Sequence, residues 1–154
     1  MRGAVLAFLL ISAVSSIAAA DTVQSTDPIA DARAKIAGAC TDLTYGPGFA
    51  RKEDLDDDGK TDLVLRFEVL CDGTYGKWCD ALACYTEIWF SVGDRAFARA
   101  AVGNIRSVSK TRHDGAVAVH ISSHGEDCPR TKSAGCRDTR VWDGKTLRVV
   151  WRDY

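Results

Sequence analysis

The chain has 154 residues, of which 46% are hydrophobic and 27% are charged, with 20 Lys and Arg against 21 Asp and Glu. This length predicts one domain with a core of modest size. The formal net charge of −1 argues against a nucleic-acid partner or an anionic lipid surface, because both attract strongly basic proteins.

The N-terminus has the parts of a secretory signal peptide. Arg2 supplies a positive charge, an apolar stretch runs from Val5 to Ile17, and Ala18 to Ala20 offer a small-residue cleavage site. The apolar stretch is shorter than the roughly 20 residues of a membrane-spanning helix, so a membrane anchor is less favoured. We therefore expect residues 1–20 to be a signal peptide and residues 21–154 to be a single domain without a membrane span, periplasmic or secreted.

The first expected element of the mature chain is a helix. Residues 21–27 are polar and are expected to be disordered. Asp27 is suited to cap a helix and Pro28 to begin it, and apolar residues then recur at helical spacing up to Cys40. Turn-forming residues from Tyr45 to Gly48 separate this helix from the rest of the chain.

The rest of the chain is typical of strands joined by tight turns. Asp-Gly pairs between β-rich runs are a strong short-range signal for hairpins. The expected strands cover residues 62–70, 85–92, 96–102, 105–111, 116–122, 137–142 and 146–151. We therefore predict a mainly β fold with one N-terminal helix, a small antiparallel meander of hairpins stapled by disulfides.

The cysteine pattern predicts three disulfides. All six cysteines follow the expected signal peptide, and an even number in an exported domain favours disulfide pairing. Zinc binding is less favoured because the sequence has no C-x-x-C pair and its histidines are not spaced with the cysteines as zinc ligands. Cys128 and Cys136 bracket a short polar loop, which favours a bridge between them.

The other two pairings are less well defined by the sequence. Cys71 ends one expected strand and Cys84 begins the next, so these two cysteines would face each other if the strands pair. Cys79, at the tip of the intervening loop, would then reach Cys40 at the helix end. Six cysteines allow many connectivities, and the sequence leaves them open.

An acidic loop before the first long strand is the most specific motif. Residues 54–62 read Asp-Leu-Asp-Asp-Asp-Gly-Lys-Thr-Asp. A calcium ion takes about six to eight oxygen ligands. Asp54, Asp56 and Asp58 alternate, so a tightly wound loop can turn three carboxylates inward, while Gly59 permits the sharp turn that closes the loop. This spacing predicts a calcium site.

The other loop residues have separate expected roles. Lys60 would supply its backbone carbonyl with its ammonium pointing outward, Asp62 would bind the ion directly or through a water, and Asp57 would point to solvent. The loop differs from an EF-hand, because Leu65 stands where an EF-hand has a bidentate Glu and a strand follows. A solvated acidic turn without an ion is the alternative, although inward carboxylates without a cation repel one another.

The pattern D-x-D-x-D-G-x-x-D followed by a strand resembles the calcium loop of FG-GAP and VCBS-type repeats. The resemblance covers residues 54–65 and implies calcium chemistry, but not a propeller, which needs several blades where this chain has one loop. More broadly, the chain resembles small proteins exported by Gram-negative bacteria. These proteins combine a signal peptide, an Asp-rich loop, a Cys-rich hairpin (residues 71–84 here) and a terminal Trp-Asp-Gly turn (residues 142–144). No activity comes with this second resemblance.

Two further groups of residues are candidate functional sites. Tyr75 and Trp78 lie in the Cys-rich hairpin and are expected either to pack as a satellite core or to form a recognition loop. His120, Ser122 and His124 share one face of an expected strand, where no carboxylate is placed to orient either histidine. We expect that face to be solvated rather than catalytic.

No pattern in the sequence indicates an enzyme active site. Glu68 and Glu87 lie on adjacent expected strands, but surface carboxylates are more common than acid–base pairs. We therefore expect a non-enzymatic protein with a structural calcium loop that binds a protein or a glycan of the cell envelope. A secreted hydrolase inhibitor, or an enzyme with a site assembled from dispersed residues, are the alternatives.

Overall fold

The structure is a computed structural model that describes residues 23–75, 77–124, 128 and 135–153. The expected signal peptide, residues 1–20, therefore lies outside the described residues, as does most of the polar loop between Cys128 and Cys136. Within the described part of the chain, no helix is long and apolar enough to cross a membrane.

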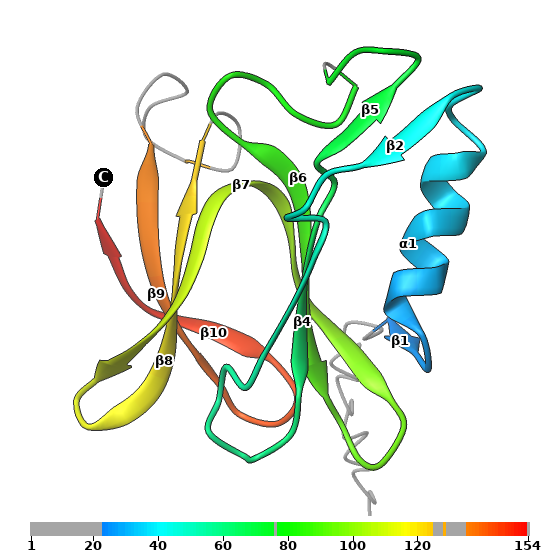
Figure 1. Cartoon of the computed structure of the whole chain (residues 1–154). Helices are drawn as coiled ribbons and strands as arrows, with labels where there is room; N and C mark the ends of the chain where they lie inside the picture. Colours follow the sequence, from blue (N-terminus) through cyan, green and yellow to red (C-terminus); the bar gives the residue numbers. More distant parts are fainter. Residues whose placement is uncertain (1–22, 76, 125–127, 129–134, 154) are drawn as a thin grey trace, which may run out of the picture.

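A curved antiparallel sheet makes up most of the described structure (Figure 1). Neighbouring strands follow the order β10-β9-β8-β7-β6-β4-β3, and β1 pairs with β7 beside this path. The strands are β1 (Gln24–Ser25), β3 (Ala50–Glu53), β4 (Asp62–Arg66), β6 (Cys84–Ser91), β7 (Phe97–His113), β8 (Ala116–Ser123), β9 (Cys136–Trp142) and β10 (Leu147–Asp153). The predicted fold class is confirmed, because consecutive long strands pair as a meander after a single described helix.

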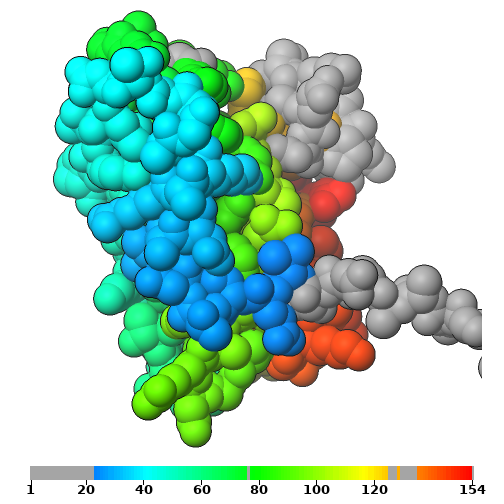
Figure 2. All heavy atoms as spheres, turned by 90° about the vertical axis from the view of Figure 1, so that its right-hand side faces the viewer, coloured from blue at the N-terminus to red at the C-terminus, as the bar shows by residue number. Residues whose placement is uncertain are grey.

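The helix and a small second sheet lie on one side of the main sheet (Figures 1 and 2). Helix α1 (Pro28–Ala37) begins as predicted, since the Asp27 side chain accepts a hydrogen bond from the Ala30 N–H at 3.0 Å. Strand β2 (Leu43–Tyr45) pairs with β5 (Val69–Cys71). Ile36 of α1 is fully buried in a hydrophobic cluster with Phe67 and Trp89, so this cluster attaches the helix to the sheet.

Strand β7 is the longest element and turns the sheet. The two strands expected over residues 96–102 and 105–111 are one strand, whose first half pairs with β6 and whose second half pairs with β8. An irregularity in the β8 pairing between Ile105 and Ser107 accompanies the change of partner. The two halves of the sheet enclose the main core, which contains Leu55, Val64, Ile88, Phe90, Ile105, Val108, Val119, Ile121 and Leu147.

Two other expectations about the elements were wrong. The strand expected over residues 62–70 divides, because β4 ends at Arg66 and β5 begins at Val69, where the chain leaves the main sheet to pair with β2. Residues 21–27 were expected to be disordered, yet β1 pairs with β7, and the Arg99 N–H donates to the Val23 carbonyl at 2.9 Å. Backbone pairing of this kind does not require apolar side chains, so hydrophobic periodicity does not reveal it.

The disulfides differ from the expected set at two of three positions. They join Cys40 to Cys71, Cys79 to Cys84 and Cys128 to Cys136, with Cα–Cα distances of 5.3, 4.0 and 5.6 Å. The Cys128–Cys136 pair is the one that the sequence favoured. The expected Cys71–Cys84 and Cys40–Cys79 pairs were wrong. The reason is that β5 carries Cys71 to β2 beside the helix end, instead of to β6.

Candidate metal centre

The acidic loop connects β3 to β4 and brings three carboxylates together. One carboxylate oxygen from each of Asp54, Asp56 and Asp58 lies within 4.8 Å of the other two, so this group could hold a metal ion. Gly59 has a φ of 81° and its N–H donates to Asp54 Oδ2 at 3.0 Å, which closes the loop. The Asp58 N–H donates to Asp56 Oδ1 at 3.2 Å. The alternation of aspartates therefore forms the cluster that the spacing predicts.

Two features of this cluster favour a positive ligand. Asp54 Oδ1 is buried and has no hydrogen-bond partner among the described residues. An unsatisfied buried acceptor costs about 1–3 kcal/mol, and more when it is charged. Burial, and after it the charges of Asp58 and Asp54, raise the pKa of Asp56 above its ordinary value. A cation among these oxygens would give Asp54 Oδ1 a partner. It would also relieve the repulsion between carboxylates that contributes to the raised pKa of Asp56.

Asp62 lies outside the group of three and ties the loop to the sheet. Its side chain accepts the Leu55 N–H at 2.8 Å through Oδ2 and the Ser91 N–H at 2.9 Å through Oδ1. The residue is 1% exposed, and burial raises its pKa to about 6. Asp62 therefore positions the start of the loop against β6, and direct ligation by its carboxylate stays a prediction.

We expect Asp62→Ala to lower the free energy of unfolding by about 2 kcal/mol in calcium-free buffer, because it leaves two backbone N–H groups without their acceptor. Urea denaturation of the two proteins measures this loss. An exposed aspartate on a turn, Asp94, provides the control, and Asp94→Ala should change the stability by less than about 0.5 kcal/mol. Equal stability of the Asp62 variant and the wild type would contradict the positioning role.

Asp57 is exposed, as expected, and it also forms ion pairs with two basic residues of β7. Its Oδ1 lies 2.7 Å from Lys110 Nζ and its Oδ2 lies 3.3 Å from an Arg112 nitrogen. The Lys110 hydrogen bond is the main reason that the pKa of Asp57 lies below its ordinary value. Lys110 also donates to the Asp54 carbonyl at 2.8 Å. Two residues of β7, Lys110 and Arg112, therefore bind the loop. They are too distant in sequence for the motif to predict them.

Lys60 is exposed, but its ammonium contacts one carboxylate of the cluster. Its ammonium was expected to point outward, but its Nζ lies 3.2 Å from Asp58 Oδ2, and its backbone N–H donates to Asp58 Oδ1 at 2.8 Å. The backbone N–H, with the ammonium after it, lowers the pKa of Asp58. An incoming cation would compete with the Lys60 ammonium for this carboxylate.

An open hollow of about 480 Å³ adjoins the cluster. Asp56 and Asp58 line one part of it, and Trp142 with Gly144 line another. The Trp142 ring stacks on Phe90 with 4.6 Å between ring centroids and 7° between their planes. The terminal Trp-Asp-Gly turn therefore lies beside the acidic loop, a neighbourhood created by the fold and not by sequence proximity.

The possible recognition residues of the Cys-rich hairpin divide between the two expected roles. Trp78 packs against Phe67 and Tyr85, with ring centroids 5.3 and 5.8 Å apart. Tyr75 is 50% exposed, and Leu82, within the turn closed by the Cys79–Cys84 disulfide, is 45% exposed. Trp78 therefore belongs to the core side of the hairpin, while Tyr75 and Leu82 are available on its surface.

The remaining candidates have structural contacts. Glu87 was expected at the surface but is 4% exposed, and it lies 3.4 Å from Lys35 Nζ and 3.3 Å from an Arg99 nitrogen. It accepts the Trp89 indole N–H at 3.1 Å. His120 Nδ1 lies 2.9 Å from the Thr139 hydroxyl oxygen. The contacts of Glu87 connect α1 to the sheet, and the contact of His120 connects β8 to β9. Each of the two side chains therefore has a structural role.

No protein-family model, curated protein or solved structure matches this chain. The acidic loop and its surroundings are therefore the basis for assigning a function.

Proposed function

We propose that the loop of Asp54, Asp56 and Asp58 binds one Ca²⁺ ion that stabilises an exported, disulfide-stapled interaction module. The observation that carries this proposal is the buried, unpartnered Asp54 Oδ1 beside two further carboxylates. The resemblance of residues 54–65 to FG-GAP and VCBS-type loops agrees with it. The three disulfides favour a periplasmic or secreted location, because such bonds persist in oxidising compartments.

The donor set favours calcium over other metals. The three clustered side chains offer carboxylate oxygens, the ligands of a hard cation. The six cysteines are held in disulfides and supply no thiolate for zinc or copper. Magnesium demands a tighter octahedral shell and gives up water reluctantly, so it would bind this open loop less well. The ion would have a structural role, because it would fix the β3–β4 connection against β7.

The surface of the Cys-rich hairpin supports a binding role. Tyr75 and Leu82 are exposed beside the Cys79–Cys84 disulfide, which restrains the loop and lowers the entropy lost on binding. A protein or a glycan of the envelope is the proposed partner of this non-enzymatic protein. The same exposed loop favours a hydrolase inhibitor as the second candidate, because inhibitors present a rigid loop to the enzyme.

Calcium should raise the melting temperature of the wild-type protein by a few degrees. The loop lacks the Glu of an EF-hand, so we expect a Kd on the order of 0.1–1 mM, as in extracellular modules. At a calcium concentration of about 20 times Kd, binding to the folded state adds about 1.8 kcal/mol. Thermal denaturation with calcium, with magnesium and with EDTA measures the shift, and magnesium should give much less of it.

Two neighbouring variants provide the control. Asp58→Ala removes a carboxylate of the cluster and should abolish the calcium-dependent shift. Asp57→Asn removes one charge on the outer side of the loop, and Asn tolerates the φ of 62° found at this position. Asp57→Asn should lower the basal stability through the loss of its ion pairs while keeping most of the calcium shift. Equal loss of the shift in both variants would show a diffuse charge effect instead of a site.

A further inference from the structure

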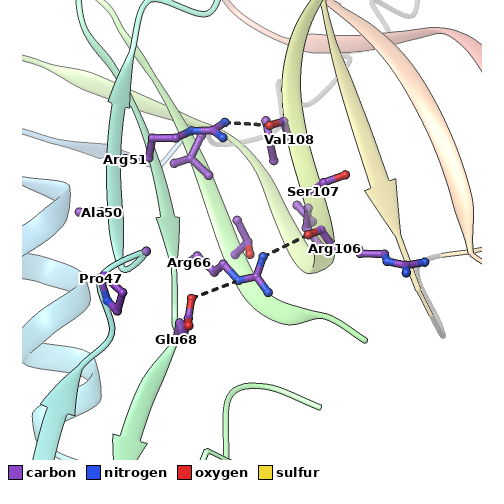
Figure 3. A pocket seen from close by; sticks show the side chains of 12 residues that line it. Pro47, Ala50, Arg51, Arg66, Glu68, Arg106, Ser107 and Val108 are labelled. Carbon is purple, nitrogen blue, oxygen red and sulfur yellow. Dashed lines mark hydrogen bonds and ion pairs between the residues drawn. The ribbon is translucent and has the colours of Figure 1, made fainter. Parts of the chain in front are cut away.

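A cavity of about 400 Å³ lies on the other side of β3 and β4 from helix α1, away from the acidic loop (Figure 3). It exists because β6 stops pairing with β7 at Ile105, whereas β7 continues to His113 with β8 on its other edge. Beyond Ile105, the edge of β7 that faces β4 has no strand partner among the described residues. The cavity is the space between that edge and strands β3 and β4.

Two arginines span this space. Arg66 donates to the Arg106 carbonyl at 3.1 Å, and Arg51 donates to the Val108 carbonyl at 2.8 Å (Figure 3). In an antiparallel strand, the N–H and the C=O of one residue point to the same edge. The backbone N–H of Val108 therefore faces the cavity as well, and the two guanidinium groups add further donors.

The guanidinium of Arg66 is the central polar group of the cavity. Its Nε is buried without a hydrogen-bond partner among the described residues. The neighbouring Glu68 Oε2 lies 3.8 Å away, close enough for an ion pair but beyond hydrogen-bond distance (Figure 3). Figure 3 shows the Arg66 side chain within the cavity, whereas the Arg106 side chain points away from it. Arg66 thus has unused donor capacity toward a ligand.

The floor of the cavity is apolar. Val64, Ile105 and Val108 line it and are 7%, 4% and 6% exposed. All three belong to the main hydrophobic core between the two halves of the sheet. An apolar floor beneath a few convergent polar groups is the usual composition of a small-molecule site, and the volume lies within the range of such sites.

We propose that this cavity binds a small organic acid, with its carboxylate on Arg66 and a short apolar tail on the floor. Guanidinium and carboxylate match in charge and in planar geometry, and a carboxylate offers acceptors to the Arg66 guanidinium, whose Nε has no hydrogen-bond partner among the described residues. Glu68 opposes such a ligand, because its negative charge stands beside the same guanidinium. This site is separate from the calcium loop and does not depend on it.

The test is a titration of the ¹⁵N-labelled protein with hexanoate, followed by NMR, with hexanamide as the uncharged probe of the same length. Hexanoate should shift the amide signals of residues 64–68 and 105–108 in a saturable way. Hexanamide should bind at least about tenfold more weakly, because it cannot pair with Arg66 by charge. Equal binding of the two probes, no saturable shift, or shifts confined to other residues would overturn the proposal.

Three variants test whether the carboxylate of hexanoate binds at Arg66. Arg66→Gln should weaken hexanoate binding about tenfold, while Arg106→Gln, the matched loss of an arginine whose side chain points away, should change it less than about twofold. Glu68→Gln should tighten binding about threefold, because it removes the opposing charge. This gain keeps the proposal testable even if Arg66→Gln fails to fold. Equal effects of the two arginine variants, or weaker binding by Glu68→Gln, would contradict it.

Discussion

Removal of the Cys40–Cys71 disulfide, by replacing both cysteines with alanine, should lower the free energy of unfolding by about 3.5 kcal/mol. The bond closes a loop with a sequence separation of 31, and loop-closure entropy predicts a cost of this size. The Cys79–Cys84 bond closes a separation of 5, so its removal should cost about 2 kcal/mol. Full reduction should remove most of the stability, since domains are stable by about 5–15 kcal/mol.

Mass spectrometry of the unreduced, digested protein checks the pairing that underlies this ranking. The structure predicts a peptide in which Cys40 is linked to Cys71, and no reactive thiol in the denatured, unreduced protein. Urea denaturation of the two double variants then gives the two stability losses. Detection of Cys40 linked to Cys79 would contradict the pairing, and a larger loss for the shorter loop would contradict the entropic explanation.

Replacement of Asp138 by alanine should cost about 3 kcal/mol. Asp138 is 4% exposed on β9, and its carboxylate lies 2.6 Å from an Arg140 nitrogen and 2.7 Å from an Arg152 nitrogen. Breaking a buried ion pair typically costs about 3–5 kcal/mol, and the lower end applies because both arginines are partly exposed. Asp94→Ala, at an exposed turn, should cost less than about 0.5 kcal/mol in the same denaturation measurement.

The contribution of Asp138 should also depend on pH. Burial would raise the pKa of its carboxyl, but Arg152 and Arg140 outweigh burial and hold the pKa below its ordinary value. The stabilisation is therefore complete above the unfolded-state pKa of about 4 and is lost as the pH falls through the lowered folded-state value. The stability difference between wild type and Asp138→Asn should shrink below about pH 4. A constant difference from pH 7 to pH 3 would mean that charge is not the cause.

The sequence predicted local features of the fold better than long-range ones. The cap at Asp27 and the hairpin turns depend on neighbouring residues, so composition and spacing identify them. The division between β4 and β5 and the Cys40–Cys71 bond depend on where β5 goes in space, which hydrophobic alternation does not determine. The single long β7 was missed because Gly103 and Asn104 interrupt the apolar pattern without ending the strand.

The same distinction applies to the candidate metal centre. The cluster of Asp54, Asp56 and Asp58 follows from alternation within one tight loop, so the motif predicts it. The contacts of Asp57 with Lys110, and the approach of Trp142 to the loop, join residues from opposite parts of the sheet. The arginine-spanned cavity likewise arises where β6 stops pairing along β7, a consequence of strand lengths that no local motif records.

Terbium luminescence tests the calcium loop most directly. Tb³⁺ occupies oxygen-rich calcium sites and emits when a nearby tryptophan is excited, and Trp142 lines the hollow beside Asp56 and Asp58. The wild-type protein should show saturable emission with one ion per chain, which calcium displaces and magnesium displaces poorly. Asp58→Ala should lose this emission and Asp57→Asn should keep it. Emission that calcium does not displace, or that survives in Asp58→Ala, would contradict a calcium site in this loop.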